Sequence, residues 1–447
     1  MKYHFIGIGG IGMSGLAMHL ASEGNQVYGS NYEENERVDY LRAKGINIFI
    51  GHSYENFEKP DVVVRTTAIK QGNPELVRAM SEGVPTIYRM ELLKNLLSRN
   101  TSLCVTGTDG KTTTTAMISK ILVDSGRDPT VLLGGINPLL SDGNYRKGEG
   151  LIVSELDESD GFFASFKPDY AIITNVRGDH LEHYDNSFDN LKNHFKYFAR
   201  GVENMLVTNA DDSVSERIFK GSLTFGRDRG DYRFSDRATG IMNQTFRCWK
   251  GDTDLGLFKL MIPGEYNAYN ATAAVALAHE MGVPIESIKN SLESYRSVDR
   301  RFTFRGLDDF RNLFFFDDYA HTPDEISSTI RGAREFFPGK NVVVVFQPHR
   351  YSRLVRENGR FAMSLKDATE VCVYKLYEAY EKGQYAIDET EVLKGLSSYG
   401  VPAVHAVNYS EILEWLEKKR DAVILFLGAG DITEASKMSA LKLCEAH

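Results

Sequence analysis

The sequence is poor in cysteine, has no long apolar run and carries no excess of positive charge. Its 447 residues include four cysteines without a Cys-x-x-Cys spacing, which fits a reducing compartment and argues against a cysteine metal site. No stretch reaches the roughly 20 apolar residues that span a bilayer, and the start does not have the form of a signal peptide. The formal net charge of -9 gives no basic footprint for nucleic acid. These absences predict a cytoplasmic protein that neither binds nucleic acid nor inserts into a membrane, and they leave an anionic small molecule as a ligand.

Three stretches of the chain share one order: an apolar run, a break at glycine or polar residues, and an amphipathic helix. They start at Lys2, Ser102 and Asn341. Alternating strand and helix signals of this kind predict parallel sheets with right-handed crossovers. We therefore predict an α/β protein of three domains, with limits at 1–98, 99–296 and 297–447. A segment of short mixed runs, from about 205 to 262, is predicted to add strands to the middle domain.

A glycine-rich turn, "GIGGIGMSG" from Gly7, lies between a predicted strand and a predicted helix. Glycines there allow a tight turn and bring the N–H groups of the helix start close to a diphosphate. An NAD site would also need an acidic residue at the end of the second strand, about twenty residues further on. That strand ends in Ser30 and Asn31. The pattern favours a diphosphate-bearing ligand other than NAD, with an NAD oxidoreductase and a ligand-free turn as the alternatives.

A second turn, "TGTDGKTT" from Thr106 to Thr113, is typical of a phosphate-binding loop between a strand and a helix. Val105 stands where the standard motif has its first glycine, so the loop is a shortened variant. Lys111 would reach the β- and γ-phosphates as a point charge, and Thr112 would offer its hydroxyl to Mg²⁺. We predict that this loop binds the phosphates of a nucleotide.

Two further strand ends carry candidate metal ligands. The run "LIVSELDESDG" places Glu155 just beyond its strand, where a carboxylate can meet the metal. The next three acids are expected in a solvated loop: Asp157, Glu158 and Asp160. A later strand over 170–174 leads into a loop with His180. Its imidazole could ligate a second Mg²⁺ or Mn²⁺, or only form hydrogen bonds within the loop, and the residues alone leave both roles open.

Taken together, these motifs resemble those of the Mur ligase family, the ATP-dependent amide-forming ligases of peptidoglycan synthesis. The resemblance extends over the whole chain, and its remaining motifs are "GEYNAYNATAA", "VDRRF", "DDYAHTPDEI", "FQPHRYSRL" and "GAGDI". It implies a Rossmann-like N-terminal domain that holds a UDP sugar and a central P-loop-type ATPase domain with a parallel sheet. The third domain would be Rossmann-like and would hold the incoming amino acid.

Within the family, the opening and the last three motifs are most similar to the branch that joins L-alanine to UDP-N-acetylmuramate. The implied reaction transfers the γ-phosphoryl group of ATP to the lactyl carboxylate, and the amine of alanine then attacks the acyl phosphate, giving ADP and phosphate. A branch that attaches a recycled tripeptide is the alternative, and a folate polyglutamylating ligase and a P-loop kinase are weaker rivals. The implied cofactors are ATP and two Mg²⁺ ions, with Mn²⁺ as an alternative. The chain is expected to be a monomer or homodimer.

The resemblance also assigns roles to individual residues. The residues assigned to catalysis are Lys111, His180, Arg301 and His321. Those assigned to ATP are Gly107, Thr108, Asp109, Gly110, Lys111, Thr112, Thr113, Asn267, Asn270 and Asp318. The UDP sugar would contact Gly7, Gly9, Gly10, Ile11, Gly12, Met13, Ser30, Thr66 and Thr67. The amino acid would contact His349, Arg350 and Arg353, and the metal would be held by Thr112, Glu155 and His180.

Four positions differ from the family pattern. Asp109 and Thr322 stand where this branch usually has histidines, and Asn31 replaces an acidic residue near the uridine. Phe195 falls about where other members carry a modified lysine, so no carbamylated lysine is expected. None of these changes removes a group assigned to the chemistry, and the effect of the first three is left open.

Overall fold

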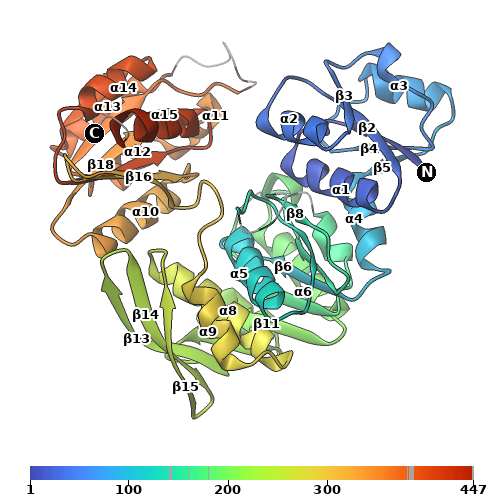
Figure 1. Cartoon of the computed structure of the whole chain (residues 1–447), viewed down its shortest axis with the longest axis horizontal. Coiled ribbons are helices and arrows are strands. Elements are labelled where there is room, and N and C mark those ends of the chain that lie inside the picture. Colours follow the sequence, from blue (N-terminus) through green and yellow to red (C-terminus); the bar gives the residue numbers. More distant parts are fainter. Residues whose placement is uncertain are drawn as a thin grey trace. The chain divides into compact units, whose positions relative to one another are not determined.

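The computed structural model of the chain describes residues 1–138, 140, 143–159, 161–179, 181–379, 381 and 387–444. The chain divides into two compact units. The first unit comprises Met1–Ser235, Cys248–Gly256 and Tyr269–Leu292, and the second comprises Asp236–Arg247, Leu257–Ala268 and Glu293–His447. Figure 1 labels many of the helices and strands of both.

The N-terminal sheet has the strand order β3-β2-β1-β4-β5, and all four neighbouring pairs run parallel. This is the order expected of a Rossmann-like domain. The strands are β1 Lys2–Ile6, β2 Gln26–Asn31, β3 Asn47–Ile50, β4 Val62–Arg65 and β5 Thr86–Tyr88. The helices are α1 Ile11–Ser22, α2 Glu36–Ala43, α3 Pro74–Ser81 and α4 Arg89–Leu97, with a 3₁₀ turn η1 Tyr54–Asn56. As predicted, β1 ends at the glycine turn and β2 ends at Asn31.

The central sheet has the order β15-β14-β13-β12-β11-β10-β6-β9-β7-β8. Strands β11, β10, β6, β9 and β7 are parallel neighbours, so the loops that follow them lie at one edge of the sheet. The first strands are β6 Ser102–Thr106, β7 Thr130–Leu132, β8 Tyr145–Arg146, β9 Ile152–Glu155 and β10 Tyr170–Ile173. The others are β11 Met205–Asn209, β12 Leu223–Arg227, β13 Tyr232–Gly240, β14 Asn243–Lys250 and β15 Thr253–Leu260, which confirms the extra strands predicted between 205 and 262.

The helical elements of this middle region are α5 Lys111–Asp124, η2 Phe162–Ser165, η3 Leu181–His183, α6 Phe188–Gly201, α7 Ser213–Ile218, α8 Glu265–Glu280 and α9 Ile285–Glu293. Helix α6 buries Leu191, Phe195 and Phe198, whose spacing places them on one face. The ring of Phe195 lies 4.7 Å from that of Phe163 in η2. Because α6 and η2 follow the loops after β10 and β9, this packing fixes the ends of both loops.

The third sheet has the order β16-β17-β21-β18-β19-β20, antiparallel between β16 and β17 and parallel elsewhere. Its strands are β16 Thr303–Asp308, β17 Leu313–Asp318, β18 Asn341–Phe346, β19 Glu370–Tyr374, β20 Ala403–Ala406 and β21 Ala422–Leu427. Its helices are α10 Pro323–Phe336, α11 Tyr351–Glu357, α12 Arg360–Leu365, α13 Thr390–Ser398, α14 Tyr409–Leu416 and α15 Ile432–Cys444. The central strands β18 and β21 are almost fully buried, as expected where helices cover both faces.

The predicted α/β class with three largely parallel sheets is confirmed. The domain limits at 98/99 and 296/297 stay predictions. Among the described residues, no helix is long and apolar enough to cross a membrane.

Candidate active site

The glycine turn after β1 is held by the end of β2. The carbonyl of Ser30 accepts hydrogen bonds from the N–H groups of Gly7 and Ile8 at 2.8 and 3.0 Å. Gly7 has a φ of +84°, a left-handed conformation that favours glycine. Gly10 then caps α1. The first N–H groups of this helix have no partner inside it, which makes its start suited to a diphosphate.

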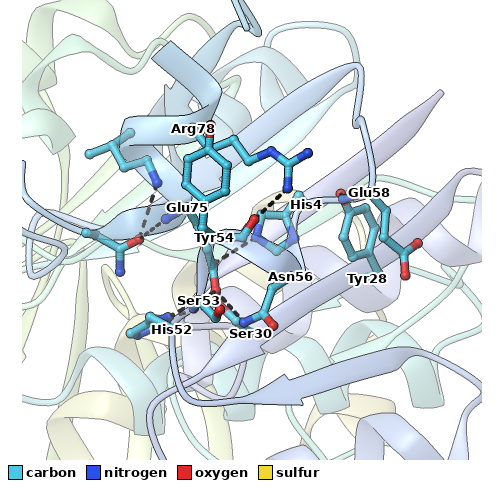
Figure 2. Close-up of polar contacts among 12 residues, drawn as sticks. His4, Tyr28, Ser30, His52, Ser53, Tyr54, Asn56, Glu58, Glu75 and Arg78 are labelled. Carbon is cyan, nitrogen blue, oxygen red and sulfur yellow. Dashed lines mark hydrogen bonds and ion pairs between the residues drawn. The ribbon is translucent and has the colours of Figure 1, made fainter. Parts of the chain in front are cut away.

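The hydroxyl of Ser30 belongs to a buried network around Glu75, which Figure 2 shows. Oε2 of Glu75 accepts from Ser30 Oγ at 2.6 Å and lies 2.9 Å from Nε2 of His4. Oε1 accepts from the amide of Asn56 at 2.8 Å and lies 3.6 Å from Nδ1 of His52. Burial by itself would raise the pKa of Glu75, but the hydrogen bonds from His4, His52 and Ser30 hold it well below its usual range. The predicted sugar contact of Ser30 thus falls on a hydroxyl that this network already uses, and it stays a prediction.

The other residues assigned to the UDP sugar surround the same turn. Met13 is 1% exposed and packs in the core, with its side chain beside Gly10 of the turn. Gly12 lies against Arg89, the first residue of α4, because a Cβ at Gly12 would be 2.6 Å from Nη1 of Arg89. Thr66 and Thr67 follow β4 directly, the first half-buried and the second exposed. Their contacts with a ligand stay predictions.

The phosphate loop joins β6 to α5 and is held by the loop after β10. Gly107 has a φ of +130°, and a Cβ there would lie 2.2 Å from Oγ1 of Thr174. The N–H of Thr108 donates to the carbonyl of Asn175 at 3.1 Å, and the N–H of Asp109 donates to Oδ1 of Asn175 at 3.0 Å. Only glycine therefore fits at position 107, and the neighbouring strand end sets the shape of the loop.

At the start of α5, a residue of α8 that is assigned to ATP lies against the loop. Gly110 caps the helix with a φ of +81°, and a Cβ there would lie 2.4 Å from Oδ1 of Asn270. Asn267, one turn earlier on α8, is 4% exposed, and its amide donates to the carbonyl of Pro263 at 2.6 Å. Asn270 thus lies against the phosphate loop, while the ATP contacts of both asparagines stay predictions.

Lys111 is bound within the loop and to an acidic neighbour. Its Nζ donates to the carbonyls of Gly107 and Thr108 at 2.8 and 3.0 Å. It also forms an ion pair of 2.7 Å with Oε2 of Glu158, which is 1% exposed. Burial raises the pKa of Glu158 to about 7, although Lys111 lowers it. The expectation of a solvated acidic loop is therefore wrong for Glu158.

The same correction holds for Asp157, which is only partly exposed. Burial raises the pKa of Asp157, but the charges of Lys111 and Arg89 help to lower it. Asp160 lies outside the described residues. The error has a physical cause, since no local pattern distinguishes an acid that faces solvent from one that meets a lysine of another strand end.

Thr112 and Glu155 meet as the metal prediction requires. Oγ1 of Thr112 donates to Oε1 of Glu155 at 2.9 Å, and the N–H of Gly134 donates to Oε2 at 3.0 Å. Burial raises the pKa of Glu155, and Asp157 adds to that effect. Glu155 is the last residue of β9 rather than the first beyond it. A hydroxyl and a carboxylate are the hard oxygen ligands that Mg²⁺ prefers, so these residues fit the ion.

His180, the third predicted ligand, lies outside the described residues. In the part of the chain that is described, no group of three or more His, Cys, Asp or Glu side chains forms a metal site. The assignment of Thr112, Glu155 and His180 to a metal stays a prediction.

In the second unit, Asp318 and His321 lie at and just beyond the end of β17. The carboxylate of Asp318 accepts from the N–H groups of Phe302 and Ala320, both at 2.8 Å, and burial raises its pKa to about 6. Nδ1 of His321 lies 3.2 Å from Oε2 of Glu325. Burial lowers the pKa of His321 although Glu325 raises it, which leaves the imidazole neutral near pH 7.

Nη1 of Arg301 lies 3.7 Å from Oε1 of the same Glu325. Glu325 thus contacts both Arg301 and His321, which are predicted to be catalytic. The guanidinium also lies over the ring of Tyr319, 5.4 Å from its centre. Sequence reasoning did not single out Glu325, because its role depends on partners from two other segments.

The predicted amino-acid site is a cluster of cations at the end of β18. His349 stacks on the ring of Tyr377 at 5.5 Å, and its Nδ1 lies 3.2 Å from Nη1 of Arg353. Arg353 lies on α11, whereas Arg350 precedes that helix and has a φ of +69°. Non-glycine residues rarely adopt that conformation, and the hydrogen bond from its N–H to the carbonyl of Tyr377 at 2.9 Å holds it. Burial, then Arg353 and Arg350, lower the pKa of His349 to about 4.

Three of the unusual positions have local explanations. Oδ1 of Asn31 accepts from the N–H of Gly9 at 3.1 Å while its amide donates to the carbonyl of Glu33 at 2.7 Å, and an aspartate could not make the second bond. Thr322 caps α10 in a capping box with Glu325. Phe195 belongs to the core, as described above. Asp109 pairs with the exposed Arg177 at 3.0 Å.

A phosphate loop at the edge of a parallel sheet, followed by a helix whose second residue meets a carboxylate, places the chain among the α/β proteins that bind nucleotide phosphates. Residues 2–101 match the catalytic domain of the Mur ligase family, residues 105–278 its middle domain and residues 300–430 its glutamate ligase domain. The chain belongs to the Mur ligase family.

Relatives of high similarity extend along the whole chain. It is 44% identical over 439 residues to the UDP-N-acetylmuramate–L-alanine ligase of Thermotoga maritima, covering 98% of this chain and 95% of that protein. It is 39% identical over 455 residues to the ligase of the same name from Aquifex aeolicus, covering 97% and 96%. The crystal structure of the Thermotoga maritima enzyme superposes with a TM-score of 0.91 at 41% identity over 100% of both chains. A murein peptide ligase from Psychrobacter arcticus, 21% identical with a TM-score of 0.70 over 100% of this chain and 99% of that one, shares the fold.

Proposed function

We propose that this chain is an ATP-dependent ligase that joins L-alanine to the lactyl carboxylate of UDP-N-acetylmuramate, a step of peptidoglycan precursor synthesis. The observation that carries the proposal is the similarity, along the whole chain, to ligases named for this reaction. The phosphate loop supports it, because Lys111, Thr112 and Glu155 lie together as an ATP-dependent reaction requires.

The chemistry explains why a phosphate loop serves an amide-forming enzyme. A carboxylate does not react with an amine until one of its oxygens becomes a leaving group. Transfer of the γ-phosphoryl group of ATP to the lactyl carboxylate forms an acyl phosphate and ADP. The amine of alanine then attacks the acyl carbon, and the tetrahedral intermediate expels phosphate. Phosphoryl transfer depends mainly on positioning and charge neutralisation, which is the part we assign to Lys111.

Mg²⁺ is the metal that the hydroxyl of Thr112 and the carboxylate of Glu155 would hold, and it would neutralise phosphate charge when bound. A second ion at His180, and Mn²⁺ in place of Mg²⁺, are further parts of the proposal. The N–H groups of the phosphate loop would orient the polyphosphate, and Asn267, Asn270 and Asp318 would contact the nucleotide.

The cation cluster at the end of β18 would bind the carboxylate of alanine. A guanidinium forms paired hydrogen bonds with a carboxylate, and Arg353 is held beside His349 for that purpose. Because the pKa of His349 is lowered to about 4, its imidazole is neutral at pH 7, and the positive charge of the cluster comes from the arginines. Arg301 and His321 would act on the reacting phosphate, oriented by Glu325.

We also propose that the protein acts in the cytoplasm. Its four cysteines are free, and three of them are buried, as expected in a reducing compartment. A monomer or homodimer stays the prediction for its oligomeric state, which gel filtration with light scattering would decide.

The test is phosphate release with ATP, Mg²⁺ and UDP-N-acetylmuramate, either with L-alanine or with the tripeptide in its place. We expect release that depends on L-alanine, with an amide product of the corresponding mass. Release that requires the tripeptide would instead support the alternative ligase. ADP formation without free phosphate would indicate a kinase and overturn the proposal.

A further inference from the structure

In the ion pair between Lys111 and Glu158, the carboxylate is buried and the side chain of the lysine is partly buried. Nζ of Lys111 lies 2.7 Å from Oε2 of Glu158, whose side chain is 2% exposed. Within the described part of the chain, Oε2 of Glu158 has no hydrogen-bond partner. The positive charge of the Lys111 ammonium therefore compensates the negative charge of this carboxylate. Taking the cation away from such a carboxylate would leave a buried charge without a partner, which is the costly case for a buried pair.

The backbone of Glu158 is anchored without help from the lysine. Its carbonyl accepts hydrogen bonds from the N–H of Gly161 at 3.1 Å and from the hydroxyl of Tyr184. Tyr184 is itself 2% exposed and its ring packs on His194 of α6. The carboxylate therefore reaches Lys111 from a fixed position and can determine where the ammonium lies.

The ammonium of Lys111 has three donors. Two of them reach the carbonyls of Gly107 and Thr108, and the carboxylate of Glu158 lies beside the ammonium as an ion-pair partner. A phosphate oxygen that approaches the ammonium competes with these three neighbours. Losing the ammonium costs a neutral carbonyl less free energy than it costs a buried carboxylate. The phosphate oxygen therefore replaces a carbonyl, and the ion pair with Glu158 is kept.

Resting on the proposed ATP-dependent reaction, we propose that Glu158 is a positioning residue for Lys111. Its carboxylate orients the ammonium toward the phosphates of ATP and offsets the lysine's charge in the site. The orientation favours turnover, because phosphoryl transfer is sensitive to placement. When Glu158 is charged, its negative charge offsets that of Lys111 and weakens the attraction for ATP. The two effects act on different kinetic constants, which makes them separable.

Two substitutions separate the effects in the full-length enzyme. Glu158→Gln keeps an oxygen acceptor but removes the charge, so we expect the KM for MgATP to fall about three- to tenfold and kcat to change less than about threefold. Glu158→Ala removes the acceptor as well, and we expect kcat to fall about 10- to 100-fold without a rise in that KM. Glu149→Gln, an exposed acid of the same domain, is the matched control and should change neither constant.

The Lys111→Ala background distinguishes positioning from a structural role. There, Glu158→Ala should lower kcat no further than about threefold, because the group that it positions is gone. An equal loss of kcat in both backgrounds, or a loss of ATP affinity and melting temperature in both Glu158 variants, would overturn the inference. Should Lys111→Ala itself leave turnover unchanged, the phosphate loop and the proposed function would fail instead.

Discussion

Glu75 and Glu158 are both buried, but their pKa values are shifted in opposite directions. Glu75 accepts hydrogen bonds from several donors, which hold its pKa well below its usual range, whereas burial raises the pKa of Glu158 to about 7 beside a single lysine. The number of donors around a carboxylate decides between these outcomes, because each hydrogen bond to the charged form favours it. Glu75 is thus a stabilising residue, whereas Glu158 is suited to the positioning of Lys111 that we propose.

The lowered pKa of Glu75 predicts a pH-dependent contribution to stability. The folded state keeps the carboxylate charged where the unfolded state takes up a proton, so the contribution is full above the ordinary glutamate pKa of about 4.3 and is lost as the pH falls below it. Glu75→Gln should therefore lower the free energy of unfolding by about 3 kcal/mol at pH 7, and the difference from the wild type should shrink below pH 4.

Urea unfolding at several pH values, followed by circular dichroism, measures this difference. Glu149→Gln, at an exposed position, is the control and should show no such dependence. A Glu75→Gln effect that is constant with pH would mean that packing, and not charge, makes Glu75 important.

At the scale of elements, the phosphate loop depends on its neighbour as much as on its own glycines. Asn175 and Thr174, at the end of β10, bond the loop from outside, and Gly107 is the point of closest approach. The motif "TGTDGKTT" indicates a loop between a strand and a helix, and this was confirmed. The contacts from β10 could not be predicted, because they arise from strand order in the sheet.

Gly107→Ala should therefore abolish measurable ATP binding. The added Cβ would meet Oγ1 of Thr174 at 2.2 Å and would also occupy a φ of +130°, so the loop would have to move. Gly126→Ala, at the end of α5, is the control, since its φ is +76° but nothing lies within 4 Å of its Cβ. Calorimetric titration with MgATP should show binding to the control variant alone, and equal binding to both would contradict the assigned loop.

At the scale of the whole molecule, the first unit joins two sheets by polar contacts. Nη2 of Arg37 donates to Oδ1 of Asn144 at 2.6 Å, and the amide of Asn144 donates to the carbonyl of Ile11 at 2.7 Å. Nearby, Ser22 and Tyr145 share a hydrogen bond of 2.7 Å. The glycine turn and the strands that follow the phosphate loop are thereby linked within one compact unit.

These contacts predict two cooperative unfolding transitions in calorimetry, one for each unit, rather than three. Asn144→Ala removes three hydrogen bonds of the buried amide, one of them to Oγ of Ser14, so it should lower the melting temperature of one transition by several degrees and leave the other unchanged. Asn243→Ala, at the half-buried start of β14, is the control, because the amide of Asn243 bonds locally, to the carbonyl of Ile241. Three separate transitions would mean that the first two sheets unfold independently.

The sequence by itself determined the fold class, the glycine turn, the phosphate loop and the family, because these depend on residues that are neighbours in the chain. Glycine is favoured where φ is positive, and a lysine that follows a glycine-rich turn at a helix start is suited to bind an anion. The tertiary structure alone decided which acid meets Lys111, that Ser30 donates to Glu75, and that Arg350 lies outside α11. The two acid pairings join residues from segments far apart in the chain, and burial shifts their pKa values, so no local pattern contains them.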